Sequence, residues 1–299
     1  MLDVRRLHLL TTVAARGSIT AAAQSLGLTP GAVSQQLSAL RRDLGVDLLR
    51  PDGRTVTLTD AGRVLVAHAD RILAAISEAE SAVAATTGTV GTSVTLAALP
   101  STAARIVAPA LHALTLDHPQ LTVRCLIGDA AQQSELRLGS VDVILAQRYH
   151  HMPRPSDADV RTQPLLDDPI LVVTAPAHAP RSPVPLADLA THRLALAPPD
   201  TDCGQAVLYA CRQAGFTPDS PYLTADITAQ LTLARAGLAT ALVPAMAIET
   251  TIGLSTTPIA GNPIHRQLYT ATRHTDARHP TIDALTAALR TAAHPTTIN

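Results

Sequence analysis

Polar side chains that could form specific hydrogen bonds to another molecule are concentrated between Thr29 and Gly45. Thr29 is a good N-cap and Pro30 suits the first helical position, so a helix is predicted to start here. It is predicted to end at Gly45. An apolar stripe at helical spacing would face the protein: Val33, Leu37, Leu40 and Leu44. The outward face is small, polar and basic: Gly31, Ser34, Gln35, Ser38 and Arg42.

This outward face could read DNA. Gln and Arg can each make two hydrogen bonds to one base edge, and Ser can bond a base or a phosphate. Thr29, Pro30 and Gly31 lie at the helix N-terminus, where free amides favour a phosphate. An ordinary helical hairpin whose polar face is solvated remains the alternative.

A shorter helix is predicted just before this one. Ser18 is its N-cap and Gly27 ends it. Its apolar stripe would be Ile19, Ala22, Ala23 and Leu26. Two helices joined by a three-residue turn that contains Gly are typical of a helix-turn-helix.

A β-hairpin is predicted after the second helix. Residues 51–53, Pro-Asp-Gly, form a turn signal, and Val56 and Leu58 alternate with threonines. Arg54 lies at the tip, where it could reach the minor groove or the DNA backbone. An Arg on an isolated hairpin would simply face water.

A long helix should follow, because Thr59 is a good cap and no Gly or Pro occurs between Gly62 and Gly88. Apolar residues recur along it at alternating steps of four and three, which is a heptad pattern. The pattern predicts a dimerisation seam, although a helix packed on its own domain would show a similar stripe. The seam residues are Leu65, Ala69, Ile72, Ile76, Ala79 and Val83.

Composition limits the possible classes of protein. The chain has 299 residues, of which 46% are hydrophobic, which is enough for two or three globular domains. Residues 1–71 hold nine Arg and six Asp, a net charge of +3, whereas the net charge of the whole chain is −1. A basic N-terminal segment therefore precedes an acidic remainder. No segment approaches the roughly 20 apolar residues of a membrane span, so no membrane partner is expected. Three widely spaced cysteines form no disulfide framework, which favours the cytoplasm.

The N-terminal third resembles a known family. The segment "AAAQSLGLTPGAVSQQLSALRRDLGVDLL", followed by "LTDAG", is similar to the winged helix-turn-helix and linker helix of LysR-type transcriptional regulators. The resemblance implies a cytoplasmic protein that dimerises through the linker helix, often forms tetramers, and binds an interrupted palindrome in double-stranded DNA. It also implies a small-molecule effector. Pro30 and Gly31 depart from the family, because many members carry longer DNA-contacting residues there.

The rest of the chain alternates between strand and helix patterns, which predicts a parallel sheet with helices on both sides. By resemblance it is a two-lobed α/β domain similar to periplasmic binding proteins, with a Pro-rich crossover at 150–164. The expected organisation is a winged helix-turn-helix at 1–58, a linker helix at 59–86, a hinge at 87–92 and an effector domain at 93–299. Its first lobe would comprise about 93–163 and 267–299, and its second about 164–266.

No enzymatic signature is present. The chain has no GxSxG elbow, no Walker loop and no Glu–His pair at metal-binding spacing. His150 and His151 are adjacent and should point in different directions, so we expect no metal and no cofactor. A small-molecule enzyme fused to a DNA-binding head is the alternative from another class.

Two cysteines allow a second alternative. Peroxide-sensing members of the family carry a redox pair in a region comparable to Cys203 and Cys211, although the spacing here is one residue shorter. If residues 204–214 are helical, the two cysteines are about 12 Å apart, far beyond disulfide reach. A thiol-redox regulator would then require this helix to unwind.

The effector is expected between the lobes, beyond the carboxyl ends of the strands. Ser101 and Thr102 lie at one predicted helix start and Asp129 at another, and by resemblance these match positions that hold an anionic co-inducer. The Asp129 carboxylate would repel an anion, so a cationic or neutral polar ligand such as an amino acid is expected. Alternatively, the ligand lies deeper, near Thr201, Ile227 and Thr228.

Overall fold

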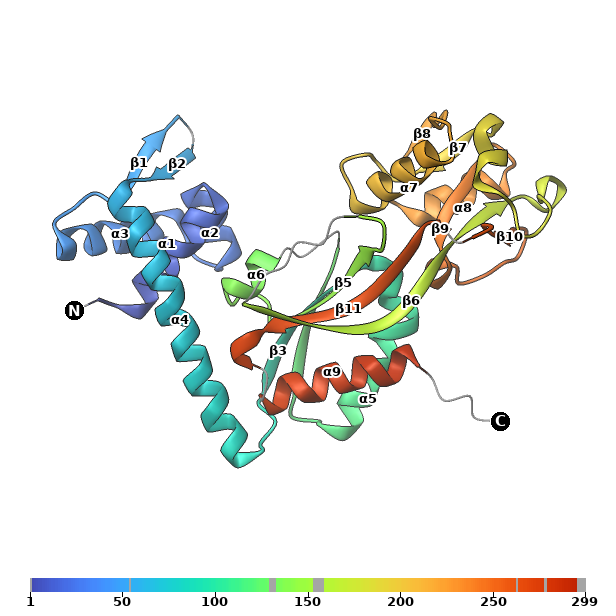
Figure 1. The fold of residues 1–299 in the computed structure, drawn as a ribbon. Coiled ribbons are helices and arrows are strands. Elements are labelled where there is room, and N and C mark those ends of the chain that lie inside the picture. The colour runs from blue at the N-terminus through green and yellow to red at the C-terminus, as the bar shows by residue number, and fades with distance from the viewer. Residues whose placement is uncertain are drawn as a thin grey trace.

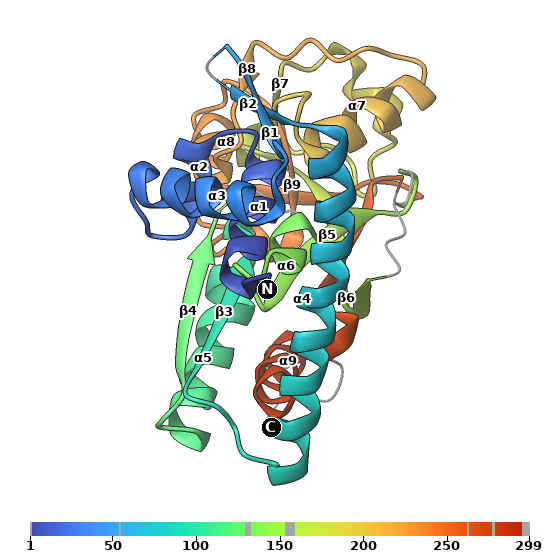
Figure 2. The same ribbon diagram turned by 90° about the vertical axis from the view of Figure 1, so that its left-hand side faces the viewer.

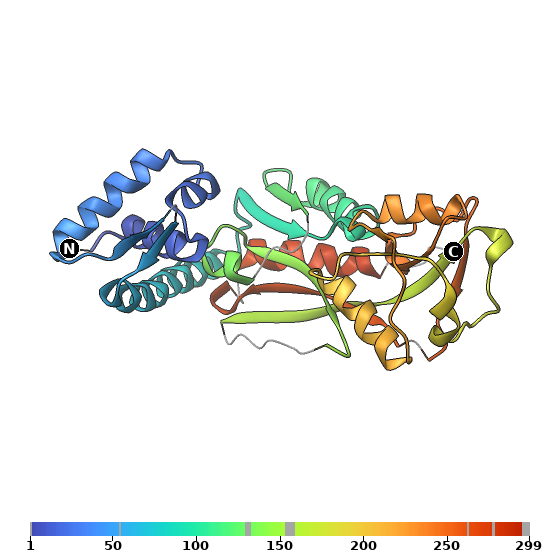
Figure 3. The same ribbon diagram turned by 90° about the horizontal axis from the view of Figure 1, so that it is seen from above.

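The computed structural model describes residues 2–53, 55–128, 133–152, 159–261, 263–276 and 279–294. The molecule is elongated, with a small helical head at one end, a long helix leading away from it, and an α/β body with two lobes (Figures 1 and 3). Two expected site residues, Arg54 and Asp129, lie outside the described residues.

The head consists of three helices and a hairpin. Its helices begin where the sequence predicts caps: the Ser18 hydroxyl accepts from the Ala21 amide, and the Thr29 hydroxyl accepts from the Ala32 amide at 3.2 Å. Apolar side chains from all three helices close one core, in which Leu10, Val33 and Leu40 are fully buried. The elements are α1 (Val4–Arg16), α2 (Ile19–Ser25), α3 (Pro30–Leu44), β1 (Leu49–Asp52) and β2 (Thr55–Leu58).

The long helix α4 (Asp60–Thr87) starts at the Thr59 cap and ends at Gly88, as the sequence predicts. Its start passes so close to the hairpin that a Cβ at Gly62 would lie 2.0 Å from the Leu48 carbonyl oxygen, which restricts this position to Gly. The N-terminal half of α4 packs on α1, and the C-terminal half packs on the short turn η6 (His274–Asp276) of the body. Figure 2 shows the full length of α4 beside the body.

The first lobe combines early and late segments of the chain. Helices α5 and α9 cover one face of its sheet, where Leu96, Ile106 and Leu285 are fully buried (Figure 1). The early elements are β3 (Ser93–Ala98), η1 (Pro100–Thr102), η2 (Ala103–Val107), α5 (Ala108–Asp117), β4 (Thr122–Ile127), α6 (Gln133–Arg137) and β5 (Val143–Tyr149). The late elements are β11 (His265–Arg273), η6 and α9 (Pro280–Ala293).

The second lobe has its own core, in which Leu189, Leu194 and Cys211 are fully buried. It is entered by β6 (Val160–Thr174) and continues through η3 (Pro176–His178), η4 (Leu186–Thr191), β7 (Leu194–Leu196), α7 (Asp202–Gln213), β8 (Tyr222–Leu223), α8 (Ile227–Arg235), β9 (Thr240–Pro244), η5 (Ala245–Ala247) and β10 (Ser255–Pro258).

The sheet of the body is mixed, which corrects the expectation of a parallel sheet. Strand β3 is parallel to β4 and β5, and β7 is parallel to β8 and β9, so the expectation holds for these strands. In contrast, β11 is antiparallel to β5, and β6 is antiparallel to β9 and β10. Strands β6 and β11 carry the chain between the lobes in opposite directions and therefore pair antiparallel with each other. Residues 160–164, expected in a Pro-rich crossover, belong to the long strand β6 (Figure 1).

Candidate functional site

The outward face of α3 is open to solvent. Pro30, Gly31, Gln35 and Arg42 are exposed, and Ser34 and Ser38 are partly exposed. On the opposite face Val33, Leu37 and Leu40 are buried. Leu44, expected in the buried stripe, is instead 37% exposed at the helix end. The head thus presents a polar and basic helix face that takes no part in packing its own core.

The two adjacent glutamines of α3 differ in their surroundings. Arg6 of α1 donates from Nε to the Gln36 side-chain oxygen at 3.1 Å and forms an ion pair with Asp43 at 2.6 Å. Gln36 therefore helps to hold α1 against α3. Gln35 is exposed one position earlier, on the face that the sequence predicts to read DNA.

The hairpin forms as predicted, with Asp52 opposite Thr55 across its tip. The Thr55 hydroxyl donates to the Asp52 carbonyl oxygen at 2.7 Å, which closes the turn. Arg50 of β1 is an exposed cation that the sequence did not single out, and its Nε donates to the Thr57 hydroxyl at 3.0 Å. The hairpin thus holds a basic side chain against its own surface.

The predicted seam of α4 is covered only at one end. Leu65 packs against the head core and Ala69 is fully buried within this chain. Farther along, Ile72 is 37% exposed and Val83 is 67% exposed. At 100° per residue, Ile72, Ile76, Ala79 and Val83 lie on the side of α4 opposite to Ser77 and Ser81. That side carries the large exposed side chains of Ile72 and Val83.

The Ser77 and Ser81 side of α4 is tied to the body of the same chain. Their hydroxyls donate to Asp276 Oδ1 at 2.9 and 3.3 Å. Asp276 is buried and forms an ion pair with Arg273 at 2.7 Å. Local sequence patterns do not predict this contact, since its partners are about 200 residues apart in the chain. Helix α4 therefore has one face occupied by the body of the same chain.

Ser101 lies in a polar network between the lobes rather than at a helix cap. It sits in η1, where no side chain caps the turn, and its hydroxyl oxygen accepts from Arg266 at 3.2 Å. Arg266 also donates to the Gln147 side-chain oxygen at 2.7 Å and pairs with Asp168. The sequence predicts a helix start at Ser101 and Thr102, but a 3₁₀ turn and a π turn occupy this segment and α5 starts only at Ala108.

The other expected effector residues are not equivalent. Thr102 is fully buried and its hydroxyl donates to the Leu99 carbonyl oxygen at 2.7 Å, so it exposes no atom to a ligand. Thr201 caps α7 by accepting from the Gly204 amide. Ile227 is half-buried at the start of α8 and Thr228 is exposed beside it. Thr201, Ile227 and Thr228 are thus at least partly exposed, whereas Thr102 packs inside the turn that carries Ser101.

Both cysteines of the second lobe lie in α7, and all three cysteines of the chain are free thiols. Because α7 is continuous from Asp202 to Gln213, Cys203 and Cys211 are about 12 Å apart along its axis. Burial raises the pKa of Cys211 to about 11 and also raises the pKa of Cys203. The geometry and the protonation state of these thiols both oppose facile oxidation.

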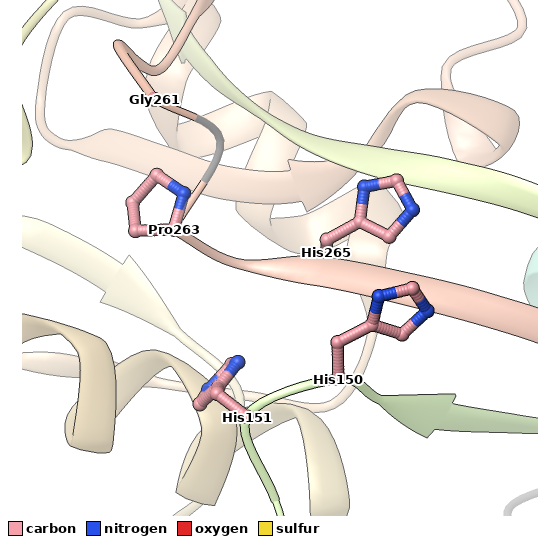
Figure 4. A pocket seen from close by; sticks show the side chains of 5 residues that line it. All are labelled: His150, His151, Gly261, Pro263 and His265. Atoms are coloured by element: carbon pink, nitrogen blue, oxygen red, sulfur yellow. The ribbon is translucent and has the colours of Figure 1, made fainter.

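His150 and His151 point apart, as expected. Figure 4 shows the His150 ring beside His265 and the His151 ring directed elsewhere. The His151 Nε2 lies 3.0 Å from the Ala206 carbonyl oxygen of α7. These three histidines border a cavity of about 420 Å³ together with Gly261 and Pro263.

Comparison with known proteins matches almost the whole chain. Residues 4–63 match the family described as "Bacterial regulatory helix-turn-helix protein, lysR family", and residues 87–294 match "LysR substrate binding domain". The regulator CbbR of Xanthobacter flavus is 31% identical over 92% of this chain and 83% of its own length. The CbbR of Rhodospirillum rubrum is 25% identical over 97% of this chain and 96% of its own length.

Solved structures agree with this assignment. A full-length OxyR from Pseudomonas aeruginosa is 20% identical, covers 100% of this chain and 99% of its own, and superposes with a TM-score of 0.72. CbnR, a LysR family transcriptional regulator, is 25% identical over 97% of this chain and 100% of its own, with a TM-score of 0.56. In the part of the chain that the structure describes, no helix has the length and apolar character needed to cross a bilayer. With both family matches and the two-part architecture, the chain belongs to the LysR family of ligand-responsive, DNA-binding transcriptional regulators.

Proposed function

We propose that this regulator binds an interrupted palindrome through the outward face of α3 in two subunits, and that a small molecule held between its lobes controls the response. The observation that carries the proposal is the exposed polar face of α3, set on a buried apolar core beside a basic hairpin. A solved structure of full-length CbnR is described as a complex with its target DNA, which supports this use of the fold.

Each proposed DNA contact has a distinct role. Gln35 and Arg42 would read base edges, since both are exposed and can form paired hydrogen bonds to a base. Ser34 and Ser38 would contact bases or phosphates, and Thr29, Pro30 and Gly31 would bring the helix N-terminus to the backbone. Arg54 would contact the backbone or minor groove from the hairpin tip.

The proposed effector is a neutral or cationic polar molecule, such as an amino acid. Ser101 already accepts a hydrogen bond from Arg266, so its own hydroxyl hydrogen is directed to another acceptor, which a ligand carboxylate could supply. The charge of Arg266 is matched by Asp168. Asp129 would then attract an ammonium group. The alternative position for the ligand is deeper, near Thr201, Ile227 and Thr228.

We also propose that the protein acts in the cytoplasm and by binding rather than by turnover. Its matched relatives CbbR and CfxR are transcription regulators, and target DNA is located in the cytoplasm of a bacterium. The free cysteines fit a reducing compartment.

The decisive experiment compares two adjacent glutamines. Binding of the full-length protein to DNA flanking its own gene, with the site defined by footprinting, is measured for Gln35→Ala and for Gln36→Ala. Gln35→Ala should cost about 1–3 kcal/mol and relax specificity at one base of each half-site, because a paired edge contact is lost. Gln36→Ala is the matched control, since Gln36 bonds Arg6 within the head.

A second measurement separates base reading from backbone contact. Arg54→Ala should weaken binding to many sequences and reduce the slope of log affinity against log salt by about one. If Gln35→Ala and Arg54→Ala both bind the footprinted site like the parent protein, α3 and the hairpin do not dock as proposed.

A further inference from the structure

Three side chains that are far apart in the sequence meet where the two lobes join. His150 follows β5, Asp167 lies in the middle of β6, and His265 begins β11. His265 Nε2 is 3.4 Å from Asp167 Oδ1, and His150 Nε2 is 3.9 Å from the same oxygen. One nitrogen or oxygen from each of the three lies within 4.8 Å of the other two.

Strand register brings them together. Strand β11 lies between β5 and β6, with Arg266 opposite Tyr149 and Gln267 opposite Asp167. Continuing the first register by one residue places His150 opposite His265, and the His150 amide donates to the His265 carbonyl oxygen at 3.1 Å. Directly paired residues share a face, as do residues two apart on one strand, so all three side chains lie on one face of the sheet.

The spacing fits a metal ion. Two ligand atoms about 2.1 Å from a tetrahedral zinc ion are about 3.4 Å apart, close to the two distances from Asp167. Imidazole nitrogens with one carboxylate are ligands that suit Zn²⁺ and its first-row neighbours, and such sets often leave open positions. The rings of His150 and His265 are 4.6 Å apart between centroids, so a small rotation of either ring would complete the set.

The surroundings support coordination. The side chains of His150, Asp167 and His265 are 42%, 54% and 23% exposed, so an ion and its waters have access from the adjoining cavity (Figure 4). Gln267 donates from Nε2 to Asp167 Oδ1 at 3.1 Å, and its own oxygen accepts from Arg148, which fixes the carboxylate in the way that outer-shell partners orient metal ligands.

We propose that His150, Asp167 and His265 form a binding site for a divalent first-row transition metal ion such as Zn²⁺. The sequence does not predict this site, because the side chains of the adjacent His150 and His151 diverge. The other two proposed ligands, Asp167 and His265, are about 17 and 115 residues from His150. Since the three ligands come from adjacent strands at the crossover, a bound ion would join β5, β6 and β11 and stabilise the folded protein.

The test uses the chelator-treated full-length protein titrated with Co²⁺ and, separately, with Zn²⁺. We expect one ion per chain, visible absorption bands of protein-bound Co²⁺, and a higher melting temperature with Zn²⁺. His150→Ala, His265→Ala and Asp167→Asn should each weaken the affinity by a factor of about ten or more, since even outer-shell changes cost that much.

Two histidine variants serve as controls. His151→Ala removes the adjacent histidine, which points to α7, and His112→Ala removes an exposed histidine of α5. Both should keep the affinity and the cobalt spectrum. If a ligand variant fails to fold by circular dichroism, His265→Gln, which keeps side-chain bulk but lacks an imidazole, replaces it. An unchanged affinity in all three ligand variants, or no binding to the parent protein at micromolar metal, would overturn the proposal.

Discussion

Arg266 of β11 donates from Nε to Asp168 Oδ2 of β6 at 2.8 Å, and both side chains are at most 3% exposed. Asp168 also accepts from the Met246 amide of η5 at 2.9 Å, while Arg266 reaches Ser101 and Gln147. One buried ion pair therefore connects both crossover strands to the turn that carries the candidate effector residue.

Breaking this pair should be costly. Arg266→Met leaves the Asp168 carboxylate buried without its cation, so the free energy of unfolding should fall by about 3–5 kcal/mol. Urea denaturation of the full-length protein measures the change. Arg41→Ala is the control, because its pair with Asp47 is 56% and 70% exposed and should be worth at most about 1 kcal/mol. Equal losses for both variants would show that the buried pair has no special role.

The exposed side of α4 should mediate self-association. Ile72→Asp combined with Ile76→Asp places two carboxylates in the proposed seam, where burial costs several kcal/mol in total, about 2 or more for each. The variant should sediment as a smaller species and lose cooperative binding to paired half-sites. Ala67→Asp with Ala85→Asp adds the same charge at exposed positions on the other side of α4 and should change neither. Retention of the parent oligomer in the seam variant would show that this stripe does not mediate self-association.

The cysteines should resist oxidation at neutral pH. Burial raises the pKa of Cys211 to about 11, so its reactive thiolate is scarce at pH 7 and increases only as the pH approaches that value. Titration of thiols after sub-stoichiometric peroxide should recover three free thiols per chain, the number in the sequence. Loss of two thiols for each peroxide consumed, abolished by either Cys203→Ser or Cys211→Ser, would instead establish a redox pair.

The effector response should depend on Ser101 and Asp129. In a panel of metabolites, a ligand at 100 times its dissociation constant should stabilise the full-length protein by about 2.7 kcal/mol. Ser101→Ala and Asp129→Ala should abolish this stabilisation while DNA affinity stays intact, because these residues lie outside the head. Ser93→Ala, an exposed serine of the same lobe, is the control.

Two results would contradict the proposed ligand site. Undiminished stabilisation of both variants would place the ligand elsewhere, with the deeper set at Thr201, Ile227 and Thr228 as the next candidate. A response confined to dicarboxylates would show that the charge argument from Asp129 is wrong.

The sequence by itself determined the head and the long helix. Ser18, Thr29 and Thr59 each cap a helix where the pattern predicts one, and Gly45 and Gly88 end helices in left-handed conformation. These signals act within about four residues, the span of one helical turn, so a single sequence is enough to read them. The exposed face of α3 follows from the same local periodicity.

Only the tertiary structure decided how distant segments meet. The mixed sheet, the Arg266–Asp168 pair and the cluster of His150, Asp167 and His265 all depend on the register between β5, β6 and β11. That register is set by contacts between residues about 100 positions apart, and a shift of one residue would turn each side chain to the other face. Local patterns carry no such information, which is why Thr102 was expected to contact the effector but is fully buried.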